Sequence, residues 1–272
     1  GIDQFIKASK KILNKEKNQE KNKDSYKKIK LTKEEVGYLL PYHKAHFIYK
    51  TQNNFESCIN PNNDWQAIEN EYFKSSKQII YIDDFLSIEA AKELRKFCLI
   101  SKIWVEEKRN KYLGSFSDKG FISPIHLQIA KELKNKLPRL FGRHRLGRFW
   151  AFKYDSFLGK GINIHADFAL VNLNFWITPD KFNNSKSTGG LKVYDMPAPK
   201  EWTFQKYNMN AQEIYKTLKQ NKANCTTIPY KFNRAVLFNS DYFHETDKIN
   251  FKDTYESRRI NITYLFGDRL FK

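Results

Sequence analysis

The most constraining feature of this chain is a change of pattern after Arg148. From there on, apolar residues gather in short runs, most of them separated by turn residues, rather than recurring at helical spacing. The runs predict six strands: Phe149–Tyr154, Ile162–His165, Phe168–Ile177, Gly190–Tyr194, Ala235–Phe238 and Arg259–Phe266. The only helical interruption that we predict among them lies around Ala211–Lys219. Helices followed by strands indicate an α+β chain whose second half is a sandwich or a barrel.

The first half of the chain predicts helices with recognisable start signals. Thr32 and Glu35 form a capping box that opens a helix through Leu40, and Pro41 is expected to end it. Three further helices and one strand are expected: Trp65–Ser75 capped by Asp64, Ile88–Cys98 capped by Ser87, Pro124–Leu137, and a strand running into a turn within Gln78–Leu86.

These patterns divide the chain into three parts. Residues 1–30 hold ten Lys and four acidic residues and are predicted to be a basic linker or fringe helix. Residues 31–77 form a helical extension, and residues 78–272 form the main domain with its core at 148–267. Because the sequence begins with Gly1 rather than Met, we expect a processed product or a piece of a longer multidomain chain.

The formal net charge is +18, and a field of this sign attracts polyanions. Lys far exceeds Arg, and Asn, Ile and Phe are abundant, which an AT-rich genome produces without selection for binding. Nucleic acid is therefore a candidate partner that is not favoured. No apolar stretch is long enough to span a bilayer. Cys58, Cys98 and Cys225 are widely spaced and odd in number, so we expect no disulfide framework and a cytoplasmic location.

A candidate metal site begins at His165 and Asp167, which are two residues apart. On a strand, residues i and i+2 point to the same side, so both side chains can face one metal. Much later, the apolar strand Ala235–Phe238 ends in a polar turn that delivers His244. Two His and one carboxylate on rigid strands are the facial ligand set of non-haem iron(II) centres, which leaves three octahedral positions open.

The last predicted strand supplies a candidate anion anchor. Its alternation places Arg259 and Asn261 on one face and Ile260 and Ile262 on the other. An arginine inside a barrel needs an anionic partner, because burying it unpaired is costly. A 2-oxo acid that chelates the iron beside dioxygen has a distal carboxylate suited to a guanidinium. Arg258 is the alternative anchor, and the alternation favours Arg259.

From about Ile79 to Gly267 the chain resembles the iron(II)/2-oxoglutarate-dependent oxygenases, whose pattern is H-x-D, a distant H and R-x-S/T/N. Four phrases are similar to a little-characterised bacterial group often linked to tetratricopeptide repeats: His165–Phe168, Trp176–Asp180, Gly189–Leu191 and Phe238–Asp241. The resemblance implies a double-stranded β-helix (jelly roll) backed by helices. It also implies that His165, Asp167 and His244 bind Fe(II) and that Arg259 anchors 2-oxoglutarate.

The resemblance further implies a dioxygenase that hydroxylates an unactivated carbon, with a slight preference for a peptide or protein side chain as substrate and an anionic substrate as another candidate. Tyr154 is a candidate co-substrate contact, by resemblance to prolyl hydroxylases, or else a core tyrosine. Asn174 and Asn261 either contact the co-substrate or satisfy backbone groups. The rival interpretation is a non-catalytic jelly-roll module that binds a sugar or nucleic acid.

Overall fold

A computed structural model describes residues 2–17, 29–43, 47–52, 55–108, 110–156 and 161–269 of the chain. The chain divides into two compact units, Gly1–Phe47 and Ile48–Lys272. Residues 18–28 of the predicted basic segment lie outside the described part. Within the described residues, no helix has both the length and the apolar character needed to cross a membrane.

The described residues of the first unit form two helices, α1 (Ile2–Lys17) and α2 (Lys33–His43). The predicted capping box is confirmed, since the Thr32 amide donates to the Glu35 carboxylate at 2.8 Å and the Glu35 amide donates to Thr32 Oγ1 at 3.2 Å. The predicted end of this helix was wrong, because α2 continues two residues past Pro41. In the last turn a proline removes only one backbone hydrogen bond, so the helix can continue briefly through it.

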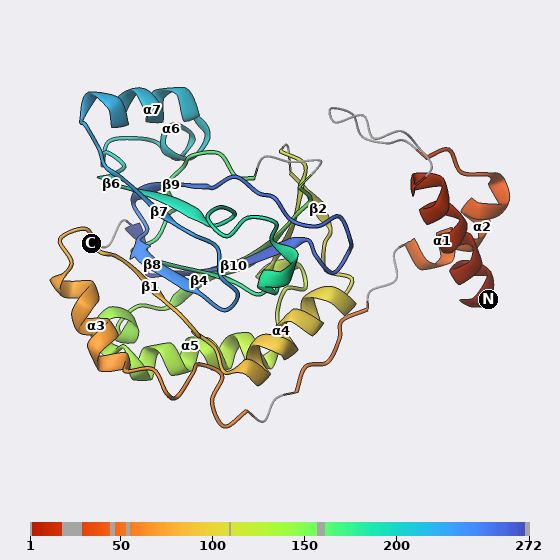
Figure 1. Ribbon diagram of the computed structural model, residues 1–272, viewed down its shortest axis with the longest axis horizontal. Coiled ribbons are helices and arrows are strands. Elements are labelled where there is room, and N and C mark those ends of the chain that lie inside the picture. Colours follow the sequence, from red (N-terminus) through yellow and green to blue (C-terminus); the bar gives the residue numbers. More distant parts are fainter. Residues whose placement is uncertain are drawn as a thin grey trace. The chain divides into compact units, whose positions relative to one another are not determined.

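The second unit is built on two antiparallel sheets that face each other (Figure 1). In spatial order the larger sheet contains β1 (Ile79–Ile82), β8 (Ala235–Asn239), β5 (Val171–Trp176), β10 (Arg259–Phe266), β4 (Leu146–Tyr154), β3 (Tyr112–Phe116) and β2 (Glu106–Glu107). The smaller sheet contains β7 (Cys225–Ile228), β6 (Leu191–Pro197) and β9 (Tyr242–Thr246).

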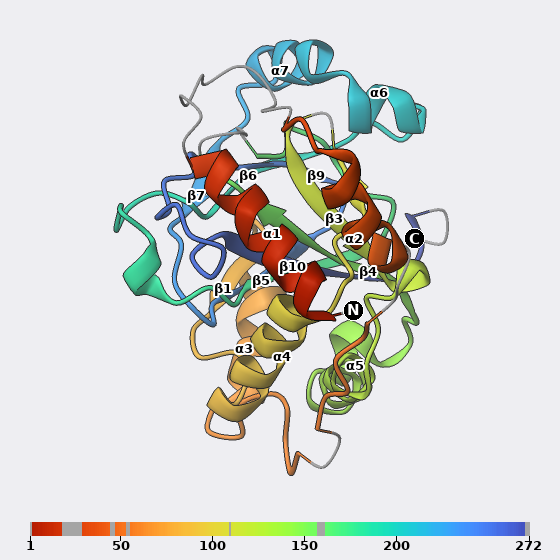
Figure 2. The same ribbon diagram turned by 90° about the vertical axis from the view of Figure 1, so that its right-hand side faces the viewer.

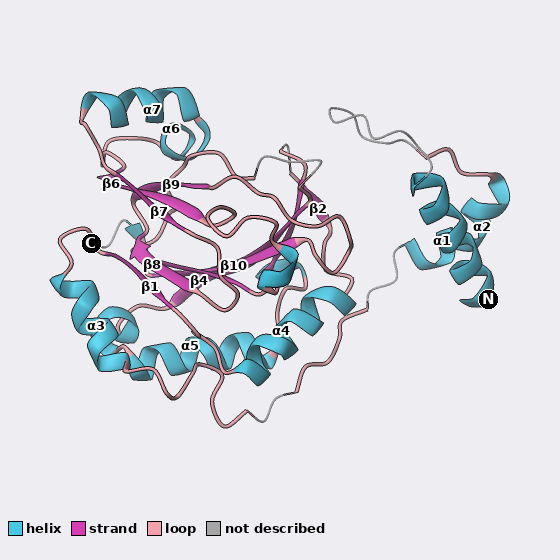
Figure 3. Cartoon of the chain, viewed as in Figure 1, coloured by secondary structure: helices cyan, strands magenta, loops and turns pink. Residues whose placement is uncertain are grey.

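Helices cover the outer faces of this sandwich. Three of them lie against the larger sheet on the side away from the smaller one: α3 (Trp65–Lys74), α4 (Ile88–Ile100) and α5 (Pro124–Lys136) (Figures 1 and 2). Beyond the smaller sheet lie α6 (Phe204–Met209) and α7 (Ala211–Gln220) (Figure 3). The predicted caps are confirmed, because Asp64 accepts from the Ala67 amide and Ser87 from the Ala90 amide.

Strand β10 shows how this architecture creates a site. All eight of its residues are buried, because helices cover one face of the sheet and the smaller sheet covers the other. Ile260 and Ile262 belong to the apolar core shared with α4 and α5. Arg259, Asn261 and Thr263 line a cavity with residues of β6 and β9 from the smaller sheet. The alternation predicted for this strand is therefore confirmed, and it turns a polar stripe toward the space between the sheets.

Several local predictions were wrong. Ile162–His165 is not a regular strand: an isolated bridge joins His165 to His244, and the Thr246 amide of β9 donates to the Ile162 carbonyl. One reason is that the Asn163 carbonyl accepts a hydrogen bond from the ring of His165, so this carbonyl does not take part in strand pairing. His244 lies inside strand β9 rather than in a turn. Besides β9, the strands β2, β3 and β7 and the helix α6 were not predicted. Strand β7, for example, reads Cys-Thr-Thr-Ile and lacks apolar alternation.

Candidate metal centre

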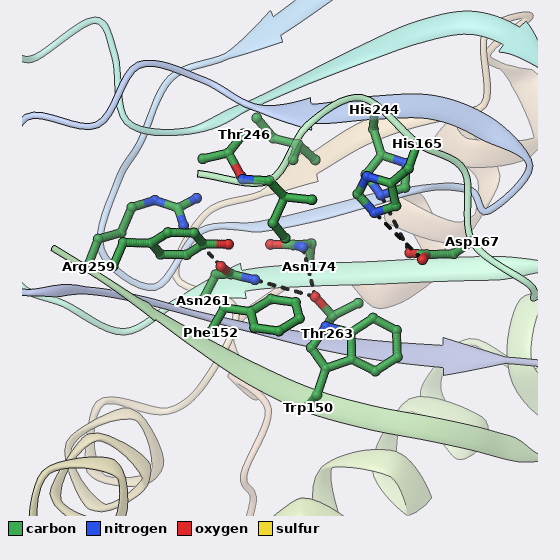
Figure 4. Close-up of a pocket in the computed structure, with 13 residues that line it drawn as sticks. Trp150, Phe152, His165, Asp167, Asn174, His244, Thr246, Arg259, Asn261 and Thr263 are labelled. Carbon is green, nitrogen blue, oxygen red and sulfur yellow. Dashed lines mark hydrogen bonds and ion pairs between the residues drawn. The ribbon is translucent and has the colours of Figure 1, made fainter. Parts of the chain in front are cut away.

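Three side chains from two chain segments converge at one end of the cavity between the sheets (Figure 4). One potential ligand atom from each of His165, Asp167 and His244 lies within 4.8 Å of the other two. His165 Nε2 is 3.7 Å from Asp167 Oδ1, and His244 Nε2 is 3.4 Å from Asp167 Oδ2. Cis ligands of an octahedral ion with bonds of about 2.1 Å are about 3 Å apart, so the three side chains lie close enough to share one ion.

Backbone pairing fixes how close the two histidines lie. The His165 amide donates to the His244 carbonyl at 3.0 Å, and the His244 amide donates to the His165 carbonyl at 2.8 Å. The same bridge places their rings 4.3 Å apart between centroids. Asp167 is held by its own amide, which donates to the Ser240 carbonyl in the turn before β9. The H-x-D segment and β9 thus form one rigid frame for the candidate ligands.

Hydrogen bonds to neighbouring groups determine which atoms of the three candidate ligands face the centre. His165 Nδ1 lies 2.8 Å from the Asn163 carbonyl, and His244 Nδ1 lies 2.9 Å from the Tyr242 carbonyl. A carbonyl can only accept, so each Nδ1 carries the proton and each Nε2 presents a lone pair. The Asn172 amide donates to Asp167 Oδ2 at 2.8 Å. This is the arrangement of contacts that metal-ligating histidines and carboxylates usually have.

The charge states suit a cation. Burial, reinforced by His244, lowers the pKa of His165 to about 4, so its imidazole is neutral at neutral pH. Burial opposes ionisation of Asp167, but its contacts with His244 and His165 more than offset this, and its pKa lies below the usual range. One carboxylate and two imidazoles form the donor set expected for iron(II). The residues present therefore fit that metal.

Arg259 lies at the other end of the same cavity (Figure 4). It is only 1% exposed, and its guanidinium lies 4.9 Å from the ring centre of Tyr154 and 5.6 Å from that of Trp176. Its Nε donates to the Gly189 carbonyl at 2.6 Å and its Nη2 to the Gly190 carbonyl at 3.2 Å. Within the described part of the chain, no carboxylate forms an ion pair with it.

The geometry around Arg259 depends on a pair of glycines. Gly189 has φ +90°, a conformation that favours glycine. A Cβ on Gly190 would lie 1.9 Å from the Ile228 carbonyl oxygen, which is far inside contact distance. Only glycine therefore lets this segment pack closely enough for both carbonyls to accept from the guanidinium. Nη1 donates to Asn261 Oδ1 at 3.0 Å, which leaves N–H groups of Nη1 and Nη2 for a ligand.

Unpartnered polar atoms lie between the two ends of the cavity. Among the described residues, Trp150 Nε1, Tyr154 Oη and Asn174 Oδ1 are buried and have no hydrogen-bond partner. Burial raises the pKa of Tyr154 to about 12, although the Arg259 charge opposes this, so its hydroxyl is a donor. Buried polar groups normally find partners, so these atoms mark space for a polar ligand. A dicarboxylate such as 2-oxoglutarate, which spans from the metal to Arg259, fits them.

The predicted site residues can now be placed. The structure brings together His165, Asp167 and His244, and it lines the same cavity with the predicted co-substrate residues Tyr154, Asn174, Asn261 and Arg259. Arg258 points elsewhere, since its Nη2 pairs with Asp155 at 2.9 Å. The Asn174 side-chain NH2 group donates to Thr263 Oγ1 at 2.9 Å. Its Oδ1 atom has no hydrogen-bond partner among the described residues and can therefore accept from a ligand.

Sequence reasoning did not single out several further residues that line the cavity, among them Trp150, Phe152, Leu191 and Thr246. The alternation of the strand Phe149–Tyr154 could have identified the first two, since they share a face with Tyr154. Leu191 and Thr246 carry no signal of their own. The loop Lys181–Thr188 is held to the segment around Asn250 by two backbone hydrogen bonds: the Asn184 amide donates to the Asn250 carbonyl, and the Lys252 amide donates to the Phe182 carbonyl.

No protein-family model and no curated protein sequence matches the chain. Among solved structures, the chain is similar to the non-heme alpha ketoglutarate dependent carbocyclase SnoK from nogalamycin biosynthesis, with a TM-score of 0.52 and 12% identity over 78% of this chain and 87% of that one. A Pseudomonas putida prolyl-4-hydroxylase aligns with a TM-score of 0.45 and 11% identity over 75% of this chain and 99% of that one. The first likeness gives the fold: the core is the predicted double-stranded β-helix, backed by helices.

Proposed function

We propose that the chain is an iron(II)- and 2-oxoglutarate-dependent dioxygenase. The observation that supports this most strongly is one cavity with the His165, Asp167 and His244 ligand set at one end and a buried guanidinium without a carboxylate partner at the other. The likeness in fold to an α-ketoglutarate-dependent carbocyclase supports the same proposal. Iron and 2-oxoglutarate, when bound, supply the oxidation of a substrate C–H bond by dioxygen.

The residues of the chain have distinct tasks in this proposal. His165, Asp167 and His244 would hold the metal. Arg259 would hold the distal carboxylate of the co-substrate, and the Tyr154 hydroxyl would donate a further hydrogen bond to it. The aromatic side chains of Trp150 and Phe152 form part of the cavity wall and exclude water from it.

Two finer points belong to the same proposal. We propose hydroxylation of a peptide or protein side chain as the reaction, and membership of the bacterial group linked to tetratricopeptide repeats; both rest on the sequence resemblance. A reducing, cytoplasmic setting agrees with three free cysteines, two of them buried.

The test is an anaerobic titration of the protein with Fe(II) and 2-oxoglutarate, in which the visible metal-to-ligand charge-transfer band is followed. The wild type should develop the band, and His165→Ala should not. His43→Ala is the matched control, because this histidine lies on α2 of the other unit and should leave the band unchanged. If the folded wild type gives no band, the dioxygenase proposal is wrong and a non-catalytic jelly-roll module becomes the better hypothesis.

A further inference from the structure

A second cavity lies on the outside of the β-sandwich, away from the metal centre. It is a groove of about 400 Å³ along α4, and the loops that contain Pro179 and Phe232 close one side of it. The outer position of α4 is visible in Figure 1. No residue that lines this groove also lines the cavity of the candidate metal centre. The proposed dioxygenase function therefore does not account for this groove.

The groove has apolar ends and a basic middle. Ile88 lies at one end of α4 and Ile100 at the other, and each is 45% exposed. Twelve residues of α-helix separate them, which corresponds to about 18 Å. Lys92 and Lys96 line the groove between these ends, one helical turn apart. Both residues line the groove together with Leu99, Pro179 and Phe232, and contiguous exposed apolar surface of this kind marks binding sites.

The cations of the groove are not neutralised within the described part of the chain. None of Lys92, Arg95 and Lys96 forms an ion pair with a described carboxylate. Arg95 donates from Nη2 to the Glu256 carbonyl at 2.8 Å, but its buried Nε has no hydrogen-bond partner there. Burial lowers the pKa of Arg95, so a nearby anion would relieve its desolvation. The Lys96 ammonium lies 4.7 Å from the Tyr49 ring centre, a contact that leaves its charge without an anionic partner among the described residues.

We propose that this groove binds an acidic peptide segment of a partner protein, with an apolar side chain at each end and carboxylates between them. An extended peptide rises about 3.3 Å per residue, so about six residues match the length of the groove. Charge along the middle distinguishes this ligand from a fatty acid or a lipid, which carries its charge at one end. The apolar ends also disfavour a nucleic acid, whose affinity rests on its phosphates.

The proposal can be tested without iron or 2-oxoglutarate, so its failure and that of the dioxygenase proposal are distinguishable. The probe is a fluorescein-labelled hexapeptide, Leu-Glu-Asp-Glu-Asp-Phe, whose binding to the full chain is followed by fluorescence anisotropy. Charge reversal by the double variant Lys92→Glu/Lys96→Glu should weaken binding at least tenfold. The matched control is Lys131→Glu/Lys136→Glu, which reverses two exposed lysines on α5 and should change the affinity by less than threefold.

A second variant tests the apolar end. Ile100→Glu changes an exposed residue, so the protein should keep its thermal midpoint while the peptide binds several-fold more weakly. The peptide with Gln and Asn in place of its acidic residues should bind at least tenfold more weakly than the acidic one. The proposal is overturned if wild-type protein does not bind the acidic peptide at millimolar concentration, or if both lysine double variants weaken it equally. Displacement of the peptide by dodecanoate at equal concentration would also overturn it, in favour of a lipid site.

Discussion

Replacing Arg259 by alanine tests the proposed anchor of 2-oxoglutarate most directly. The guanidinium is buried, and no carboxylate among the described residues pairs with it, so the distal carboxylate of the ligand would be its anionic partner. Removing one partner of a buried charge pair costs about 2–5 kcal/mol. At about 1.4 kcal/mol for each factor of ten, the dissociation constant of 2-oxoglutarate should rise about 30-fold to several thousand-fold.

Arg258→Ala is the matched control, because this neighbour pairs with Asp155 and its side chain is 30% exposed. A pair of this kind contributes about 0–1 kcal/mol, so the affinity should change less than about fivefold. The assay is the anaerobic charge-transfer titration with Fe(II), combined with thermal denaturation to show that each variant is folded. Arg259→Lys keeps the charge but not the planar fork, and an intermediate affinity is expected. A folded Arg259→Ala protein with wild-type affinity, or a larger loss in Arg258→Ala, would refute the anchor.

Three further predictions concern single contacts. Asn172→Ala removes the hydrogen bond to Asp167 and should weaken Fe(II) binding about 10- to 100-fold in equilibrium dialysis, whereas an unchanged affinity would mean that the contact does not orient the carboxylate. Gly190→Ala places a Cβ 1.9 Å from the Ile228 oxygen, so urea denaturation should show a loss of at least about 3 kcal/mol, and a smaller loss would mean that the segment can move. Burial lowers the pKa of His126 to about 3, so below about pH 6.5 only the unfolded chain takes up the proton and stability falls as the pH decreases. Between pH 6.5 and 5.0 the wild type should lose about 1.6 kcal/mol more than His126→Phe, and equal losses in urea denaturation would contradict this.

The sequence predicted the central strands well because they are buried on both faces. Arg259–Phe266 was predicted with its observed bounds, and its alternation placed Arg259 and Asn261 on the face that the structure turns into the cavity. A polar residue in the middle of a buried strand is rare enough to carry information about a site. The local caps were predictable for a different reason: each depends on a contact within a few residues along the chain.

The predictions that failed depend on contacts between distant segments. The segment Ile162–His165 is held against β9 by the bridge between His165 and His244 and by the Thr246 amide, which donates to the Ile162 carbonyl. Nothing in the local sequence of this segment predicts so irregular a pairing. The edge strand Cys225–Ile228 is short and mostly polar, so its strand character comes from pairing with Leu191–Tyr194 rather than from its own pattern. The Gly189 and Gly190 carbonyls that hold Arg259 were likewise not predictable, because a glycine pair in a loop most often indicates only a turn.

The chemistry of the cavity distinguishes a dioxygenase from a jelly-roll module that binds a sugar or nucleic acid. A sugar could satisfy the open Tyr154 hydroxyl and the open Asn174 carbonyl, but it carries no charge for Arg259. A nucleic acid carries the charge, but the end of the cavity around Arg259 is closed by Tyr154, Trp176 and Tyr230, which are at most 5% exposed. Leaving each buried polar group unpaired costs about 1–3 kcal/mol, and more for a charge. A small dicarboxylate that chelates the metal and reaches Arg259 is the ligand that satisfies both ends of the cavity at once.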